Sequence, residues 1–184
     1  MQVHDLVADF SKIVGSDDPM VRARGLLEEL RGDLDTLAET LAFVSGVGGN
    51  AGQIFYRSPG LSLLKVSFPR GRRTPPHDHG TWASILVFSG VEKNTLYRVD
   101  DTGGLERASE VVLERGSILP MRAGTAHVAE SIGDAPAVGL HVYGGDIIGL
   151  ERRMWDPETL EQHPLEWVHY EELALKASMA ESAP

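Results

Sequence analysis

The chain has 184 residues, 42% of them hydrophobic, which suits one domain with a substantial core. Its formal net charge of −10 argues against nucleic acid or an anionic membrane as a main partner. The absence of cysteine excludes disulfides, thiolate metal ligands and a cysteine nucleophile. Because the sequence also has neither a secretory signal pattern nor an apolar run long enough to span a bilayer, we expect a cytoplasmic protein.

Residues 1–46 have the pattern of helices. Apolar side chains recur there every three or four positions, and an aspartate before Pro19 offers a helix start with proline in the first turn. Gly32 is expected to separate two helices. The glycine-rich run SGVGGNAG at 45–52 then ends the helical segment.

Residues 53–145 have the pattern of many short strands. Segments such as LSLLKVSF, WASILVFSG and AVGLHVY are rich in aromatic and β-branched residues, and turn signals divide them. Short strands at near-regular spacing predict a sandwich or a barrel. Residues 146–184 mix turn and helix patterns, and we expect them to wrap the outside of the barrel. The whole chain, 1–184, is therefore interpreted as one domain.

Two histidines stand at i and i+2 in GRRTPPHDH, where Pro75 and Pro76 restrict the backbone just before them. On a strand, His77 and His79 would leave the same face and could bind one ion. Taken alone, the pair is weak evidence for a metal site, and the alternative is two polar residues on a solvent-facing strand. A third histidine, His127, follows a strand and a glycine turn in GSILPMRAGTAH. Three neutral imidazoles would leave a divalent ion with open positions, as in catalytic sites.

This spacing resembles the two cupin motifs, at Gly71–Gly90 and Gly116–His127. The resemblance implies an all-β fold, the cupin double-stranded β-helix barrel, with a helical N-terminal segment and a C-terminal wrap. Many cupins place a glutamate ligand after the His-x-His pair, but the matching position here is Ala83. Glu130 would face away from the site if the strand alternates regularly from His127. We therefore expect a three-histidine site.

The runs HDHGTWASILVFSG, GTAHVAES and GLHVYGG resemble the thiol dioxygenases: cysteine dioxygenase and, more closely, bacterial 3-mercaptopropionate dioxygenase. The resemblance covers about residues 55–155. It implies a mononuclear non-haem iron(II), held by His77, His79 and His127, and conversion of a small carboxylated thiol to its sulfinate with O₂. The cysteine–tyrosine crosslink of mammalian cysteine dioxygenase is impossible in a chain without cysteine. That favours the bacterial branch.

The segment Gly139-Leu-His141-Val-Tyr143 resembles the Ser-His-Tyr triad of the same family, with glycine in place of serine. The resemblance gives His141 and Tyr143 a catalytic role, in which Tyr143 directs its hydroxyl at bound O₂ or thiolate and His141 orients it. The alternative is a hydrogen-bonded core pair with no part in the chemistry.

Three arginines are candidates for binding the substrate carboxylate, because the planar guanidinium suits bidentate contact. The segment YGGDIIGLERRMWDP resembles the part of the mercaptopropionate enzyme that ends in an arginine pair, with one extra residue. We favour Arg153 over Arg152 on this alignment. Arg57 lies where cysteine dioxygenases keep their carboxylate-binding arginine, across a shortened hairpin. For each of the three, the alternative is a solvated surface charge.

Two other functions are compatible with a three-histidine cupin. One is an oxygenase that acts on a carbon substrate such as a β-diketone. The other is a non-catalytic cupin that binds zinc or a small ligand. Ligand type does not separate them, because imidazole accepts iron, nickel, copper and zinc.

Overall fold

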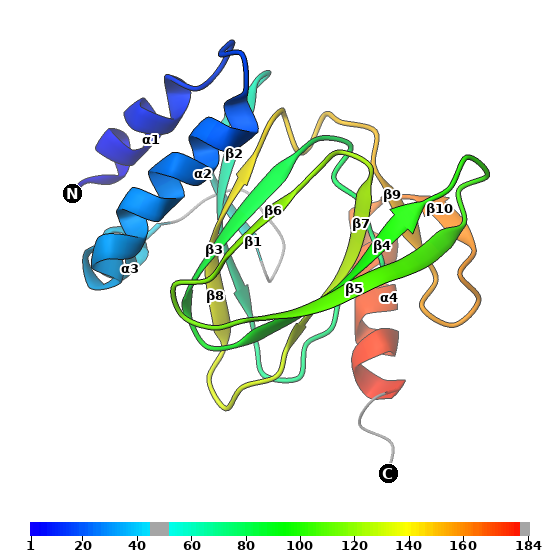
Figure 1. The fold of residues 1–184 in the computed structure, drawn as a ribbon. Coiled ribbons are helices and arrows are strands. Elements are labelled where there is room, and N and C mark those ends of the chain that lie inside the picture. The colour runs from blue at the N-terminus through cyan, green and yellow to red at the C-terminus, as the bar shows by residue number, and fades with distance from the viewer. Residues whose placement is uncertain (45–51, 181–184) are drawn as a thin grey trace.

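The computed structural model describes residues 1–44 and 52–180. Helices cover one side of a pair of facing β-sheets, and a last helix lies at the other end (Figure 1). The helices are α1 (Val3–Ser11), α2 (Pro19–Leu30), α3 (Leu34–Leu41) and α4 (Trp167–Ala180), with a 3-10 turn, η1 (Arg31–Asp33), between α2 and α3. The strands are β1 (Gly52–Ser58), β2 (Leu61–Phe68), β3 (Ala83–Ser89), β4 (Glu92–Val99), β5 (Leu105–Leu113), β6 (Ile118–Met121), β7 (Thr125–Ser131), β8 (Ala137–Tyr143), β9 (Arg153–Trp155) and β10 (Gln162–Pro164).

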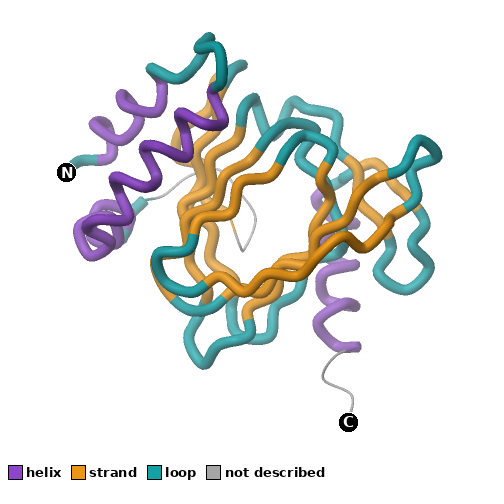
Figure 2. The backbone as a smooth tube through the Cα atoms, in the orientation of Figure 1, coloured by secondary structure: helices purple, strands orange, loops and turns teal. Residues whose placement is uncertain are grey.

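The paired strands are antiparallel, and many neighbours are distant in sequence. One sheet has the order β1-β2-β8-β3-β6, the other the order β5-β4-β7, and β9 pairs with β10. The two larger sheets curl towards each other around one interior (Figure 2). Because β8 returns to lie between β2 and β3, the chain winds as a double-stranded β-helix. The predicted fold class, an all-β cupin barrel with a helical N-terminal segment, is confirmed.

The central strands of the five-stranded sheet read as nearly continuous apolar runs because both of their faces are covered. On β3, Ile85 and Val87 point into the barrel interior, whereas Leu86 and Phe88 pack on the helical side. By contrast β5, at the edge of the smaller sheet, is exposed along most of its length. The two faces therefore define two cores, one inside the barrel and one under the N-terminal helices.

The N-terminal helices begin and end much as the sequence predicts. Pro19 is the first residue of α2, and the Asp18 carboxylate accepts a hydrogen bond from the Val21 amide at 3.1 Å. Gly32 lies in η1, which separates α2 from α3. The predicted glycine-rich break at 45–52 lies outside the described residues except for Gly52.

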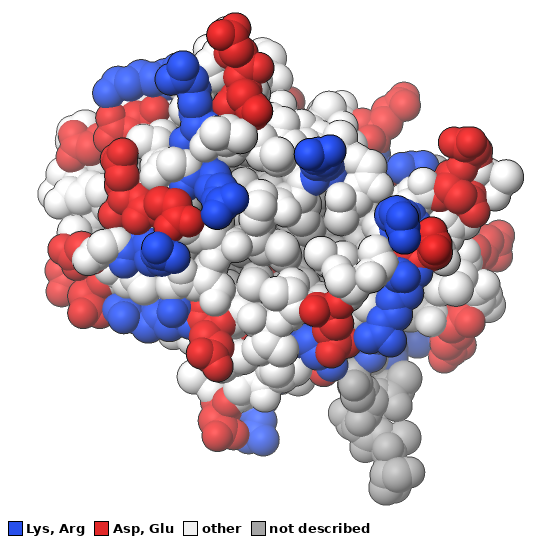
Figure 3. All heavy atoms as spheres, viewed as in Figure 1, with Lys and Arg blue, Asp and Glu red and all other residues white. Residues whose placement is uncertain are grey.

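Charged side chains of both signs are intermixed over these helices on the face drawn in Figure 3. Pairs such as Arg31 and Glu28, 2.8 Å apart, lie along the helices. Within residues 1–44 and 52–180, no helix combines the length and apolar character that a bilayer crossing requires.

The C-terminal segment differs from the predicted mixture of turn and helix, because it contains the β9–β10 hairpin before α4. Each of these strands has three residues, which is too short for a period-2 pattern to be recognised. Asp156 organises the connecting turn by accepting hydrogen bonds from the amides of Glu158 at 2.8 Å and Thr159 at 2.9 Å. The hairpin places Met154 against Tyr170 and Leu173 of α4.

We expect Leu37→Ala to lower the free energy of unfolding by about 2–5 kcal/mol, because it leaves a cavity in the fully buried core between α3 and the sheet. Chemical denaturation of the two proteins measures the difference. Val21→Ala is the control: the residue is 58% exposed, and the expected change is within about 0.5 kcal/mol. Equal losses for the two variants would contradict this account of the helical core.

Candidate metal centre

Three histidines from distant parts of the chain converge inside the barrel. His77 and His79 lie in the connection between β2 and β3, and His127 lies on β7. The main chains of His77 and His127 pair directly, with N–H···O distances of 3.0 and 2.8 Å in the two directions. One ring nitrogen of each of the three lies within 4.8 Å of the others, and all three side chains are buried. A cluster of this kind can hold a divalent metal ion.

The outward nitrogens of two ligands have partners that fix the rings. His77 Nδ1 lies 3.0 Å from the carbonyl oxygen of Pro75, and His127 Nδ1 lies 2.7 Å from Oδ1 of Asn94. Donation from both Nδ1 atoms leaves Nε2 unprotonated, as a metal ligand requires. Within the described part of the chain, Nε2 of His127 and Nδ1 of His79 are buried without a hydrogen-bond partner. Such orphaned nitrogens fit a metal as their missing partner.

Burial also favours the neutral imidazoles that a metal needs. It lowers the pKa of His127 to about 3, and it lowers the pKa values of His77 and His79 well below their usual range. Mutual repulsion among the rings and the nearby Arg152 charge act in the same direction. At neutral pH the site is therefore ready to accept a cation without first releasing protons.

The expected absence of a carboxylate ligand agrees with the surroundings of the histidines. Ala83 is fully buried and belongs to the interior core together with Tyr143. Glu130 is turned to the other side of β7, where Lys93 Nζ lies 2.7 Å from its Oε2. Among the described residues, the metal-ligating cluster consists of three histidines. An ion held there would keep open coordination positions.

The contact to His127 continues into a buried chain that sequence reasoning missed. Asn94 Nδ2 donates to Oε1 of Glu92 at 2.7 Å, and both side chains are buried on β4. Burial raises the pKa of Glu92 to about 7. Two buried polar residues at i and i+2 in the strand EKNTLYRV were the available signal, but the partner of Asn94 could be identified only from the fold.

His141 and Tyr143 share one face of β8 and line the same cavity as the three histidines. His141 Nδ1 lies 3.0 Å from the Tyr143 hydroxyl, and the rings of Tyr143 and His79 are 5.0 Å apart between centroids. Burial raises the pKa of the Tyr143 hydroxyl above its ordinary value and lowers the pKa of His141 to about 3. Both side chains are therefore uncharged beside the three-histidine cluster.

Close packing accounts for glycine at position 139. A Cβ at Gly139 would lie 3.2 Å from His141 Nε2 and 3.2 Å from the carbonyl oxygen of Leu86. A serine would therefore require the His141 ring to shift. In the described residues, Nε2 of His141 is buried with no hydrogen-bond partner.

The cavity beside the three-histidine cluster has a volume of about 70 Å³, which is room for a small organic ligand. An apolar wall faces the histidines and consists of Ile54, Leu64, Val66, Phe68 and Ile147. Helix α4 contributes Trp167, Tyr170 and Glu171, so the C-terminal segment helps to enclose the cavity.

Tyr170 is a site residue that sequence reasoning missed. Its ring meets that of His77 edge to face, with centroids 5.3 Å apart, and burial raises its pKa to about 12. The buried positions 170, 173, 174 and 177 have the i, i+3, i+4, i+7 spacing of an inward helix face. That pattern was the signal that could have placed Tyr170 inside.

The structure brings one of the three candidate arginines to the cavity, and it is Arg152 rather than the favoured Arg153. The Arg152 guanidinium lies 5.6 Å from the centroid of the Trp167 ring and lines the cavity. The Arg153 side chain points to the opposite side of the main chain and forms an ion pair with Asp78, in which Nε lies 2.7 Å from Oδ2. Successive residues in extended chain point to opposite faces, so the one-residue uncertainty in this segment decides which arginine enters.

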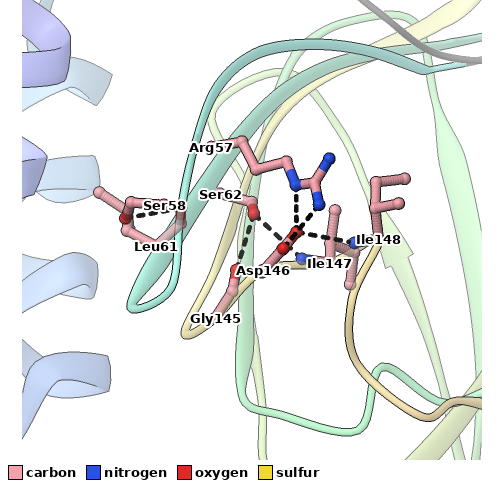
Figure 4. A network of polar contacts seen from close by, with 8 residues as sticks. All are labelled: Arg57, Ser58, Leu61, Ser62, Gly145, Asp146, Ile147 and Ile148. Carbon is pink, nitrogen blue, oxygen red and sulfur yellow. Dashed lines mark hydrogen bonds and ion pairs between the residues drawn. The ribbon is translucent and has the colours of Figure 1, made fainter.

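Arg57 does not line the cavity, and its guanidinium is bound to the Asp146 carboxylate. Its Nε and Nη2 both contact the Asp146 carboxylate, the latter at 2.7 Å, and its side chain is 47% exposed (Figure 4). Ser62 fixes the neighbouring turn by donating to the carbonyl of Gly145 at 2.7 Å and accepting from the Ile147 amide at 3.1 Å.

No protein-family model matches the chain. Similar solved structures include the cupin domain of Cnp3 from Schizosaccharomyces pombe, with 13% identity over 53% of this chain and 65% of that chain and a TM-score of 0.43. An RmlC-like cupin from Methanocaldococcus jannaschii has 13% identity over 54% of this chain and 85% of that chain, with a TM-score of 0.43. Hydroquinone 1,2-dioxygenase from Sphingomonas sp. TTNP3 has 12% identity over 55% of this chain and 70% of that chain, with a TM-score of 0.45. Identities this low concern the fold alone.

The depressed histidine pKa values predict that the metal-free protein loses stability in mild acid. Between the unfolded value of 6.5 and the folded value of about 3, the unfolded chain binds more protons at His141, so lowering the pH favours unfolding. We expect His141→Gln to reduce the slope of unfolding free energy against pH by up to about 1.4 kcal/mol per pH unit. Denaturant titrations between pH 7 and pH 5 measure that slope. An unchanged slope in His141→Gln would contradict the burial argument.

Proposed function

We propose that the protein is an iron(II)-dependent thiol dioxygenase that converts a small carboxylated thiol, 3-mercaptopropionate or cysteine, to its sulfinate with O₂. The observation that carries the proposal is the juxtaposition, in one small cavity, of a three-histidine cluster, a neutral phenol and a guanidinium. The resemblance of the motifs around His77, His127 and His141 to those of thiol dioxygenases supports it independently.

The cavity's polarity favours a small anion with a short apolar body. Arg152 supplies a cation at one end, while the apolar wall would pack against methylene groups. Glu171 also lines the cavity, but Arg72 neutralises it, because its Nη2 donates to both carboxylate oxygens at 2.9 and 2.8 Å. A carboxylate on the ligand would therefore meet the positive charge of Arg152, which Glu171 does not cancel.

His77, His79 and His127 would hold the iron(II), which supplies the redox chemistry that joins O₂ to sulfur. Both oxygen atoms go to the thiol sulfur, which becomes a sulfinate and loses one proton, so no further reductant is required. The protein's own contribution is to orient the reactants and to exclude water.

Tyr143, oriented by His141, would donate a hydrogen bond from its phenol to the reacting oxygen or sulfur. When His141 Nδ1 donates to the Tyr143 oxygen, 3.0 Å away, the phenol proton remains free to point into the cavity. Because burial keeps the phenol neutral, Tyr143 stays a hydrogen-bond donor throughout the neutral pH range.

The decisive experiment is O₂ consumption by the anaerobically iron(II)-loaded protein with 3-mercaptopropionate, cysteine and cysteamine in parallel, with products identified by mass. A sulfinate formed from a carboxylated thiol would support the proposal, and weak turnover of cysteamine would support the role of the carboxylate. Full iron loading without O₂ uptake on any thiol would refute it. Parallel trials with a β-diketone and with the zinc-loaded protein separate the two other functions.

His127→Ala is expected to abolish both iron retention and turnover, because it removes one of the three ligands and leaves Oδ1 of Asn94 without its partner. Metal content after gel filtration and the rate of O₂ uptake are the measurements. The control is His163→Ala on β10, whose ring contacts His169 outside the cavity. Normal thiol oxidation by the His127 variant would rule out the proposed site.

Arg152→Gln is expected to raise KM for 3-mercaptopropionate by about tenfold to a hundredfold, because a charge-assisted contact to the carboxylate is lost. Arg57→Gln should change KM by less than about twofold, since that guanidinium is bound to Asp146 outside the cavity. Steady-state O₂ uptake measures both. A larger effect at Arg57 than at Arg152 would reverse the assignment.

A further inference from the structure

Asp78, between the two histidines of the His-x-His pair, is buried and holds the segment that carries Arg152. Its carboxylate Oδ1 accepts a hydrogen bond from the Arg153 amide at 2.8 Å, and Oδ2 accepts from Arg153 Nε at 2.7 Å. Its main chain adds two contacts: the Asp78 amide donates to the Arg153 carbonyl at 2.9 Å, and Arg152 Nε donates to the Asp78 carbonyl at 3.3 Å. The Asp78 side chain is only 3% exposed.

These four contacts fix the orientation of two neighbouring arginines at once. With its amide and guanidinium bound to Asp78, Arg153 faces away from the cavity. Arg152, one residue earlier in extended chain, must then face the opposite way, towards the histidines. Because Asp78 lies between His77 and His79, the same loop sets both the metal ligands and the guanidinium that faces them.

A general packing role does not account for the arrangement. Burying a carboxylate is costly unless it is paired, and an apolar residue could fill such a position without that cost. The Arg153 side chain is 39% exposed, so solvent partly screens its contact with the buried Asp78 carboxylate. The paired carboxylate instead fixes the register of residues 152–153 against the loop that carries His77 and His79.

We propose that Asp78 is a positioning residue for substrate recognition: through Arg153 it holds Arg152 at the distance from the metal cluster that a carboxylated thiol requires. The inference rests on the proposed function and deepens it. It assigns the specificity for a carboxylate to the pair Asp78–Arg153 as well as to Arg152, and it gives Arg153 an indirect role in place of direct substrate contact.

The test is Asp78→Asn, in which the amide keeps the shape of the side chain but replaces one of the two acceptor oxygens that Arg153 uses with an N–H donor. Calorimetric titration of the anaerobic iron(II)-loaded protein gives Kd for 3-mercaptopropionate and for 2-mercaptoethanol, which lacks the carboxylate. We expect about tenfold weaker binding of 3-mercaptopropionate and less than a twofold change for 2-mercaptoethanol. Iron content should match that of the unaltered protein. Asp35→Asn, which breaks the surface contact to Arg115 at 2.6 Å, is the matched control and should change neither Kd.

A double variant distinguishes positioning from an independent effect. If Asp78 acts through Arg152, adding Asp78→Asn to Arg152→Gln should weaken 3-mercaptopropionate binding no further. Multiplying losses would overturn the inference, as would equal losses for the two thiols. Should Asp78→Asn fail to fold, Arg153→Gln, at a half-exposed side chain, must show the same carboxylate-selective loss and the same non-additivity with Arg152→Gln.

The outcomes also separate this inference from the proposed function. Thiol oxidation by the unaltered protein with no effect of Asp78→Asn on Kd would leave the function standing and refute the positioning role. Selective weakening of 3-mercaptopropionate binding without oxidation of any thiol would refute the dioxygenase proposal and retain the positioning role. Failure of the unaltered protein to bind 3-mercaptopropionate would refute both.

Discussion

The main chain around His77 pairs with two segments that are distant in sequence. On one side it forms a bridge with His127 of β7, and on the other it forms a bridge with Met154 of β9. Hydrogen bonds from Trp155 to Pro76 and from the Asp78 amide to the Arg153 carbonyl, both 2.9 Å, continue the second pairing. A short loop thus acts as the middle strand of a three-segment ladder. Both the convergence of the histidines and the approach of Arg152 depend on this ladder.

The ladder also determines how the C-terminal helix closes the site. Met154, which pairs with His77, is fully buried against Tyr170 and Leu173 of α4. The Arg72–Glu171 ion pair attaches the same helix to the beginning of the β2–β3 connection, which carries His77 and His79. Each element that faces the cavity from the C-terminal side is therefore anchored to the loop that carries two metal ligands. Such anchoring on paired main chain gives a site the rigidity that substrate positioning requires.

Sequence patterns were sufficient for the parts of the site that lie on long strands or follow motif spacing. The i, i+2 relations of His77 with His79 and of His141 with Tyr143 follow directly from period-2 alternation, and the second cupin motif placed His127. The barrel itself was predictable because its strands are rich in aromatic and β-branched residues and are divided by turn signals. Patterns were insufficient where one residue of register decides the outcome, since a one-residue slip turns Arg152 out and Arg153 in.

Other site residues were hidden because their roles arise only from tertiary contact. Asn94 and Glu92 are ordinary polar residues of a strand until the fold places Asn94 2.7 Å from His127. Tyr170 belongs to a helix whose inward face is visible in the sequence, but the surface it covers is not. Asp78 resembles a spacer between two ligands, and its contacts with Arg153 span 75 positions of the chain.

The glycine at position 139 leaves room for the His141 ring in the barrel interior. A relay that ends in a serine would hold the histidine through its second ring nitrogen. Here a Cβ at position 139 would lie only 3.2 Å from Nε2 of His141 and 3.2 Å from the carbonyl oxygen of Leu86 on β3, so a side chain there would displace the ring. With glycine in place, Nε2 of His141 is buried without a hydrogen-bond partner among the described residues, and Nδ1 lies 3.0 Å from the Tyr143 hydroxyl. The orientation of the phenol therefore depends on its hydrogen bond with His141 and on the packing of that buried imidazole in the barrel interior.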